Sequence, residues 1–164
     1  MATTTPFIET VEPIPYIGLP ATVPMTRIAD SAAGFGRIYA WLAMHGLTPS
    51  GASFFRYFEF HKNGLVEMQI GVPAEGQGAK EAGFVEDTLP AGRYLSLLHS
   101  GDYSGLQSAT FYMMKWAEDH RLKFQCQEEN QFSLWTARVE WYLVSPAREP
   151  DPAARMTKIS ILLA

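Results

Sequence analysis

The sequence predicts an α+β fold built from two similar halves. Two amphipathic helices are expected, and each is followed by strands rich in aromatic or β-branched residues. The ends of the two helices also resemble each other, because Trp41–Leu47 and Trp116–Leu122 share Trp, His and Leu at the same offsets. Each half therefore has the predicted order strand, helix, strand, strand. Two such halves would bury their sheets together around a pseudo-twofold axis, and a boundary of this kind is a favoured place for a ligand.

The length and composition fit one globular domain over residues 1–164, with halves at about 1–82 and 83–164. The chain has 164 residues, of which 47% are hydrophobic and 18% charged. These values are ordinary for a globular protein and unlike those of a disordered one. The chain leaves no room for a helix-turn-helix domain beside this fold, so we do not expect it to bind DNA itself.

The charge and cysteine content narrow the range of partners. The net charge is −4, and the absence of a dense Lys/Arg run argues against direct contact with nucleic acid or an anionic membrane. No apolar run approaches the roughly 20 residues that span a bilayer. The lone Cys126 cannot form an internal disulfide, which fits a reducing compartment. We therefore expect a soluble cytoplasmic protein that is a monomer or a homodimer.

In the first half, prolines from Pro13 to Pro24 punctuate a short strand around Tyr16–Gly18. Pro24 suits the first turn of a helix. The helix is predicted by apolar residues at spacings of three and four, with Gly46 as its C-cap: Ile28, Ala32, Phe35, Tyr39 and Leu42. Strands are predicted over Phe54–Phe60 and Leu65–Val72, joined by an Asn-Gly turn.

In the second half, a glycine-rich loop over residues 73–83 leads to two strands within Phe84–Leu98. A second helix is expected from Ser104, because apolar residues again keep helical spacing up to Trp116. The polar segment Lys123–Ser133 is expected to be an excursion. The last strands are predicted at residues 134–144 and 158–163.

Glu140 is the main candidate for a functional residue, because it is the single acid in the aromatic-rich run of residues 138–144. A carboxylate on an apolar surface costs several kcal/mol unless something compensates it. Side chains alternate along a strand, so Glu140 and Tyr142 share one face and Val139 lies on the other. We expect the helices to cover the Val139 face and Glu140 to face a ligand cleft.

Such an acid has two chemical uses. It can pair with a flat lipophilic cation, aided by cation–π attraction of roughly 0.5–2 kcal/mol per ring. Its pKa can also rise, which would make Glu140 a general acid or base. A structural alternative is that Glu140 lies at an exposed strand edge or pairs with Arg138.

Several aromatic residues are candidates for the walls of a pocket. Phe55 and Tyr57 share a face of their predicted strand, and Tyr112 and Trp116 lie one helical turn apart. Tyr16 in the first strand is a further candidate. Packing in the hydrophobic core is the default explanation for any single aromatic residue of this kind.

Other catalytic motifs are missing from the sequence. The four histidines are scattered without HExxH spacing, and there is no GxSxG, P-loop or GxGxxG motif. His99 and Asp102 stand too close together in one turn, beside serines, to form a catalytic triad. We therefore expect no metal and no cofactor.

Short motifs follow one another along nearly the whole chain: the helix led by Pro24 and ending at Trp41 and Gly46, Gly71-Val72-Pro73, Leu89–Tyr94, His99–Tyr103 with Leu106, Trp116, and Glu140-Trp141-Tyr142 with Pro146. In their order and spacing these motifs resemble the GyrI-like small-molecule-binding superfamily, which includes effector-binding domains of multidrug-sensing transcription regulators of the BmrR and Rob kind. The chain departs from the family at Arg121, where glycine is usual.

The resemblance implies tandem β-α-β-β modules related by pseudo-twofold symmetry, with a concave antiparallel sheet and two helices on its outer face. It also implies that Glu140 points into an aromatic ligand pocket. In drug-sensing members that acid meets lipophilic cations, and in some stand-alone members it takes part in hydrolysing cyclopropane-bearing electrophiles. Tyr57 and Tyr142 match positions of pocket aromatics.

Three functions follow as hypotheses. The favoured one is binding of lipophilic, cationic or aromatic small molecules by Glu140, Tyr142, Tyr57, Phe55, Tyr112, Trp116 and Tyr16. The second is hydrolysis of strained electrophiles, with Glu140 and Tyr57 as the catalytic residues. The third is inhibition of a macromolecular partner such as DNA gyrase. Binding is favoured because a hydrolase usually needs a second positioned group.

Overall fold

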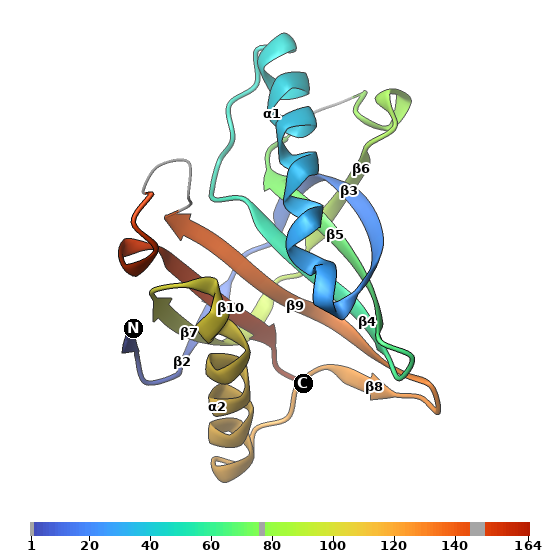
Figure 1. Cartoon of the computed structure of the whole chain (residues 1–164). Coiled ribbons are helices and arrows are strands. Elements are labelled where there is room, and N and C mark those ends of the chain that lie inside the picture. Colours follow the sequence, from blue (N-terminus) through green and yellow to red (C-terminus); the bar gives the residue numbers. More distant parts are fainter. Residues whose placement is uncertain (1, 76–77, 145–149) are drawn as a thin grey trace.

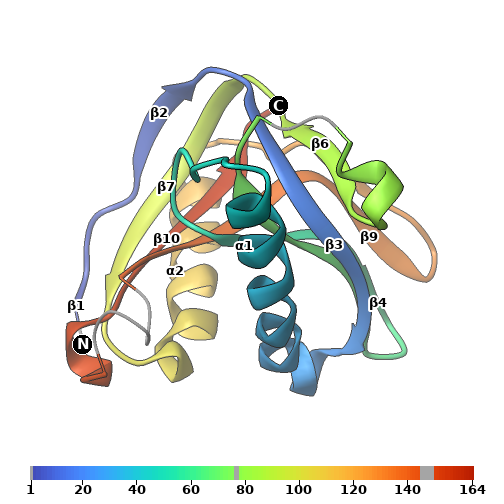
Figure 2. The ribbon, with the colours of Figure 1, turned by 90° about the horizontal axis from the view of Figure 1, so that it is seen from above.

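The computed structural model describes residues 2–75, 78–144 and 150–164. Two helices lie on one face of a strongly curled antiparallel sheet, which forms a half-barrel (Figures 1 and 2). Within the described residues the sheet has ten strands, in the order β1-β7-β10-β9-β4-β5-β3-β6, with β2 also paired to β7 and β8 to β9. This architecture confirms the predicted fold class.

The strands are β1 (Ala2–Thr3), β2 (Phe7–Val11), β3 (Ile14–Pro24), β4 (Phe54–His61), β5 (Leu65–Pro73), β6 (Val85–Leu89), β7 (Gly92–Ser100), β8 (Cys126–Glu128), β9 (Phe132–Val144) and β10 (Met156–Leu162). The α-helices are α1 (Phe35–Met44) and α2 (Leu106–Asp119). Short 3₁₀ segments are η1 (Met25–Gly34), η2 (Lys80–Ala82), η3 (Tyr103–Gly105) and η4 (Pro152–Ala154).

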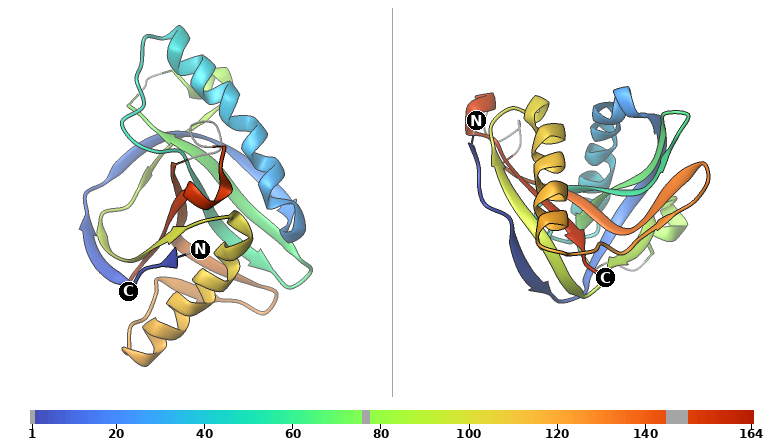
Figure 3. Two further views of the ribbon diagram at one scale, coloured as in Figure 1. Left: turned by 60° about the vertical axis from the view of Figure 1, so that its left-hand side comes forward. Right: turned by 90° about the horizontal axis from the view of Figure 1, so that it is seen from below.

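The strand order shows two modules related by a pseudo-twofold axis. The first runs β3, α1, β4, β5, and the second runs β7, α2, β9, β10. From the centre of the sheet outward the order is β4-β5-β3 on one side and β9-β10-β7 on the other, so the modules meet along the β4–β9 pair. The two modules also exchange strands. Strand β2, which comes just before the first module in the chain, pairs with β7 of the second module, and β6, which comes just before the second module, pairs with β3 of the first. Figure 3 shows one helix beside each half of the sheet.

The repeated helix ends have the same structure. In Trp41–Leu47 and Trp116–Leu122 alike, the histidine ring stacks on the tryptophan one turn earlier, with ring centroids 4.1 and 3.7 Å apart. In both, the histidine Nδ1 lies 2.8 Å from the tryptophan carbonyl oxygen. The next residue has a left-handed backbone, with φ of 65° at Gly46 and 59° at Arg121. The internal repeat is therefore a repeated way of ending a helix.

The face of the sheet that carries the helices holds the two largest apolar clusters. Side chains of α1 pack on strands β4 and β5, and side chains of α2 pack on β7 and β10. The first cluster includes Ile38, Trp41, Leu42, Phe55, Val66, Met68 and Ile70, and the second includes Ala109, Met113, Ala117, Leu95, Leu97, Ile159 and Ile161. Each helix is therefore held mainly by the sheet of its own module.

The opposite, inner face of the half-barrel has its own smaller core. Tyr16, Phe54, Leu89 and Val139 are buried together there. A cavity of about 420 Å³ lies on this side, lined by residues 9–14 and by side chains of the inner face that include Val139. The expectation that the helices cover the Val139 face is therefore wrong: they cover the Glu140 face. Aromatic or aliphatic side chains occur on both faces of β9, so alternation alone could not tell which face the helices cover.

Some predicted elements differ from the structure. Residues Met25–Gly34 form 3₁₀ turns with a kink at Arg27 (φ −124°, ψ 21°), and α1 begins only at Phe35. No side chain of Met25–Gly34 is buried, so packing does not enforce α-helical geometry there. The described part of the predicted loop at 73–83 contains the short η2 turn.

The strand predicted around Tyr16–Gly18 extends to Pro24 as β3. Among the described strands, β3 is bordered by β6 only up to Gly18, and the open edge beyond it accommodates prolines. The predicted excursion at Lys123–Ser133 contains β8, which pairs with the start of β9. Strands β1 and β2 had no signal in the sequence.

Candidate functional site

Glu140 lies in the middle of the sheet, on the strand of the second module that borders the first. It stands opposite Phe55 on β4 and Ile159 on β10. Its side chain is partly buried on the helix-bearing face, between the clusters of α1 and α2. The interpretation of Glu140 as an exposed edge residue is therefore wrong.

Two tyrosine hydroxyls donate hydrogen bonds to the same carboxylate oxygen. The Tyr57 hydroxyl lies 2.6 Å from Glu140 Oε1, and the Tyr142 hydroxyl lies 3.0 Å from it. Tyr142 is on the same face because it follows Glu140 by two residues in β9. Tyr57 comes from β4, where it pairs with Arg138, diagonally across from Glu140. The strand register thus brings three of the predicted site residues together.

Aromatic rings from both modules surround this group. Phe55 meets Tyr142 edge to face, with ring centroids 5.0 Å apart. Phe35, the first residue of α1, stacks on Phe55 at 5.7 Å, and Tyr103, in the turn before α2, meets Tyr142 at 5.6 Å. We call the set Glu140, Tyr57, Tyr142, Phe55, Phe35 and Tyr103 the carboxylate site.

Sequence reasoning missed the roles of Phe35 and Tyr103. Phe35 belongs to the apolar face that predicted the first helix, and that pattern does not distinguish a core position from a site position. Tyr103 lies within a motif that marks the start of the second helix. Their common signal is that each stands at the beginning of an α-helix or in the turn before it.

Burial dominates the electrostatics of Glu140. Removal of the carboxylate from water raises its pKa, whereas the hydrogen bonds from Tyr57 and Tyr142 and the more distant charge of Arg138 lower it. The net result is a raised pKa. Burial also raises the pKa values of Tyr57 and Tyr142 well above 10.0, and the negative charge of Glu140 adds to both shifts. Both tyrosines therefore remain hydrogen-bond donors over the physiological range.

Arg138 does not neutralise the acid by direct pairing. Among the described residues, no ion pair joins Arg138 to Glu140. The guanidinium carbon instead lies 4.3 Å from the ring centroid of Phe60 and 4.7 Å from that of Trp135. Among the described residues, the site thus holds a poorly solvated carboxylate with two neutral hydrogen-bond donors and no ion pair to a cationic side chain.

A sequence model of the GyrI-like small molecule binding domain matches residues 4–132. The chain belongs to this family. A search of the curated proteins finds no match to this chain.

Solved structures extend the likeness of this GyrI-like domain over almost the whole chain. The crystal structure of the EcmrR C-terminal domain has a TM-score of 0.71 and 18% identity, and the match covers 98% of this chain and 97% of that one. In the cryo-EM structure of the EcmrR–DNA complex (TM-score 0.76, 19% identity), the match covers 97% of this chain but 57% of the longer EcmrR chain.

Two further structures share the GyrI-like fold. SAV2435 bound to tetraphenylphosphonium has a TM-score of 0.61 and 14% identity, covering 98% of this chain and 94% of that one. A hydrolase from Listeria innocua has a TM-score of 0.60 and 11% identity, covering 97% and 91%. At these identities the structures show a common fold, while their ligands and activities remain statements about those proteins.

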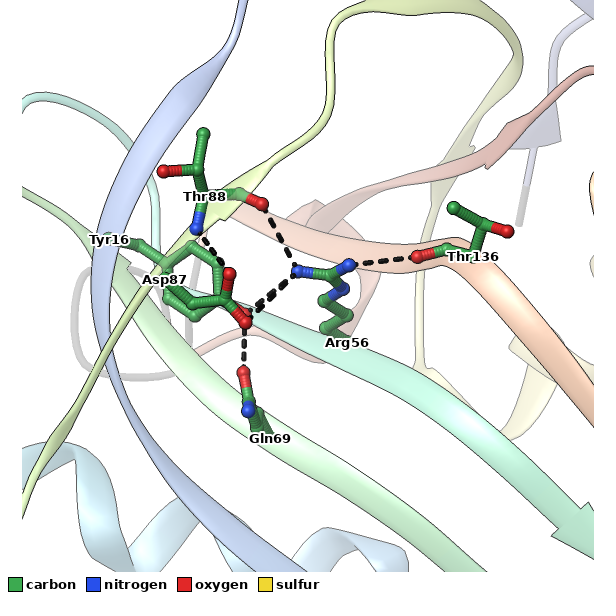
Figure 4. A network of polar contacts seen from close by, with 6 residues as sticks. All are labelled: Tyr16, Arg56, Gln69, Asp87, Thr88 and Thr136. Atoms are coloured by element: carbon green, nitrogen blue, oxygen red, sulfur yellow. Dashed lines mark hydrogen bonds and ion pairs between the residues drawn. The ribbon is translucent and has the colours of Figure 1, made fainter.

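Tyr16 is not part of the carboxylate site of this GyrI-like domain. It lies on the inner face, where its hydroxyl accepts a hydrogen bond from Arg56 Nη1 at 3.0 Å and donates one to the side chain of Gln69 (Figure 4). Arg56 Nη2 also donates to the backbone carbonyl of Thr136 at 2.8 Å. This buried network links β3, β4, β5 and β9, so the position of Tyr16 fits a structural role.

The two candidates on α2 are also apart from Glu140. Trp116 packs against the α2 cluster and stacks on His120, and Tyr112 is 45% exposed. No ring contact within the described residues joins either side chain to the carboxylate site.

None of the helices in the described residues is long and apolar enough to span a membrane.

Proposed function

We propose that this GyrI-like domain binds lipophilic cations at the carboxylate site. The observation that carries the proposal is the partly buried Glu140, which is held by two tyrosine hydroxyls and surrounded by aromatic rings from both modules. A carboxylate in such surroundings attracts an organic cation much more strongly than one in water, because the effective dielectric is lower.

The aromatic rings give the site a preference for cations that carry apolar groups. Phe35, Phe55 and Tyr103 are the aromatic residues around the carboxylate, and a cation near a ring face gains roughly 0.5–2 kcal/mol. A small hydrated cation would lose its water shell without gaining these contacts. Delocalised or shielded charges, such as phosphonium or quaternary ammonium ions with aryl groups, fit this chemistry best.

The tyrosine hydroxyls prepare Glu140 for such a ligand. They fix one carboxylate oxygen and, being neutral donors, do not cancel its negative charge. The bound form of SAV2435 supports the proposal at the level of fold, because it holds tetraphenylphosphonium.

The test is binding of tetraphenylphosphonium to the wild-type protein and to Glu140→Gln, measured by isothermal titration calorimetry. Triphenylphosphine oxide, which has similar aryl groups but no net charge, serves as the neutral probe. We expect Glu140→Gln to weaken binding of the cation at least about tenfold, or about 1.4 kcal/mol, and to change binding of the neutral probe little.

Glu118→Gln is the matched control, because Glu118 is an exposed acid on α2 whose removal changes the net charge equally. It should leave both affinities unchanged. Equal losses for the cation and the neutral probe in Glu140→Gln, or no binding of the cation to the wild type, would contradict the proposal.

Hydrolysis of strained electrophiles is the second candidate, and the observation that favours it is the raised pKa of Glu140 beside two phenol donors. A carboxylate of raised pKa is a better base toward water, and the Tyr57 hydroxyl could orient that water. Incubation with a cyclopropane-bearing alkylating compound tests this. Turnover that Glu140→Gln and Tyr57→Phe both abolish would support hydrolysis, and turnover equal to that in buffer would reject it.

A further inference from the structure

We propose that Glu59, His61 and Glu67 form a binding site for a divalent transition-metal cation, with Zn²⁺ as the best match. The three residues lie near the β4–β5 turn, where Glu59 pairs with Glu67 across the two strands. They lie on the face of the sheet opposite the helices, since their strand neighbours Val66 and Phe60 pack into the helix-side clusters. The site is therefore separate from Glu140.

The donor atoms are arranged as metal ligands require. His61 Nε2 lies 3.6 Å from Glu59 Oε1 and 3.9 Å from Glu67 Oε2, and the three donor atoms lie within 4.8 Å of one another. If the carboxylate oxygens of Glu59 and Glu67 are 4.8 Å apart, the upper limit, a point equidistant from the three donor atoms lies roughly 2.4 Å from each. This is close to the Zn–N and Zn–O bond lengths of about 2.0–2.2 Å. Small side-chain rotations would close the difference.

The strand register explains why these side chains converge. An irregularity in β4 between Tyr57 and Glu59 shifts the pairing with β5, so that Glu59 faces Glu67 directly. Like charges in directly opposite positions of an antiparallel pair destabilise the sheet. A divalent cation between the two carboxylates would turn this repulsion into attraction, and no lysine or arginine forms an ion pair with either acid among the described residues.

The imidazole distinguishes this group from an ordinary acidic patch. The His61 ring stacks on Phe132 of β9, with ring centroids 5.0 Å apart and planes at 30°, which restricts its rotation. The side chains of His61, Glu59 and Glu67 are 27%, 23% and 45% exposed, so an ion can enter and water can complete its coordination.

The mixed donor set selects among metals. One imidazole nitrogen with two carboxylate oxygens suits Zn²⁺ and its neighbours in the first transition row. Mg²⁺ prefers oxygen ligands in octahedral geometry and loses its water reluctantly. We therefore expect a clear preference for Zn²⁺ over Mg²⁺.

The test is titration of the tag-free, chelator-treated protein with ZnCl₂ by isothermal titration calorimetry, supported by the visible spectrum of bound Co²⁺. The wild type should bind one Zn²⁺ per chain at this site, with no comparable heat from MgCl₂. Glu67→Gln and His61→Asn should each weaken the binding at least about tenfold, and His61→Asn should also change the Co²⁺ spectrum.

His120→Asn and Glu118→Gln are the matched controls, because they remove an exposed histidine and an exposed acid on α2. Both should bind Zn²⁺ as the wild type does, and circular dichroism establishes that each variant is folded. Absence of Zn²⁺ binding by the wild type would overturn the proposal. So would binding that survives both His61→Asn and Glu67→Gln unchanged.

Discussion

Replacement of Glu140 by glutamine should stabilise the folded protein at neutral pH. Glutamine keeps an oxygen that can accept the hydrogen bonds from Tyr57 and Tyr142, and it removes the charge that burial disfavours. Because the pKa of Glu140 is raised in the folded state, its contribution to stability is fully present below the ordinary glutamic acid pKa of about 4.3. That contribution is lost as the pH rises through the folded-state value.

The size of the effect follows from the same linkage. Each unit by which the folded-state pKa exceeds the unfolded one corresponds to about 1.4 kcal/mol. We expect Glu140→Gln to gain on the order of 1 kcal/mol at about pH 8.5, which in a chain of this size raises the melting temperature by about 2–4 °C. The gain should shrink as the pH falls through the raised folded-state pKa of Glu140, because the wild-type carboxyl then becomes protonated as well.

The assay is thermal unfolding followed by circular dichroism, across that pH range, for the wild type, Glu140→Gln and the control Glu118→Gln. The control should show no pH-dependent gain of this size, because Glu118 is exposed. A Glu140→Gln variant that is less stable than the wild type at about pH 8.5 would refute the reasoning. A gain that is the same at both ends of the pH range would refute it too, since the effect would then not come from the charge.

Two further predictions concern stability. Arg121→Gly should raise the melting temperature by about 2–4 °C, because glycine removes the backbone strain of about 1 kcal/mol at a φ of 59°. The reverse change at the equivalent position, Gly46→Arg, should lower the melting temperature. If Arg121→Gly does not raise it, the strain argument is contradicted. Tyr57→Phe should cost about 1.5–3 kcal/mol in denaturant unfolding at about pH 8.5, because it removes a 2.6 Å hydrogen bond to a charged group. The hydroxyl of Tyr103 makes no hydrogen bond among the described residues, so Tyr103→Phe should lower the free energy of unfolding far less. Equal losses in the two variants would argue against a special role for the Tyr57 hydrogen bond.

The sequence predicted most of the scaffold because its signals are local. Helical spacing located α2, the Asn63-Gly64 pair located the β4–β5 turn, and the repeat Trp41–Leu47 located two helix ends. Arg121 shows how strong that last signal is: the left-handed position is kept although glycine is absent. Strands β1 and β2 escaped prediction because their stability comes from pairing with β7, about 90 residues away in sequence.

The candidate site was predicted in part for a similar reason. Glu140 and Tyr142 share a strand, so alternation placed them on one face. Tyr57 lies beside them because of the register between β4 and β9. The residue types suggested that Tyr57 lines the site, but they could not determine this register. Which face the helices cover depends on the packing of whole modules, and here the expectation failed. The group around His61 had no signal in the sequence, because it arises from a shift in strand pairing.

Glu140 lies on the β4–β9 strand pair, where the two modules meet, and this position connects the symmetry of the fold with the proposed function. The scaffold is repeated, but the acid occurs only in the second module, opposite Phe55 of the first. Phe35 and Tyr103 then approach from the starts of the two helices, one from each module. On the proposal of cation binding, neither module alone supplies both the charge and a complete set of rings. A ligand held there would contact both modules at once, and its binding energy would depend on how the two modules are packed against each other.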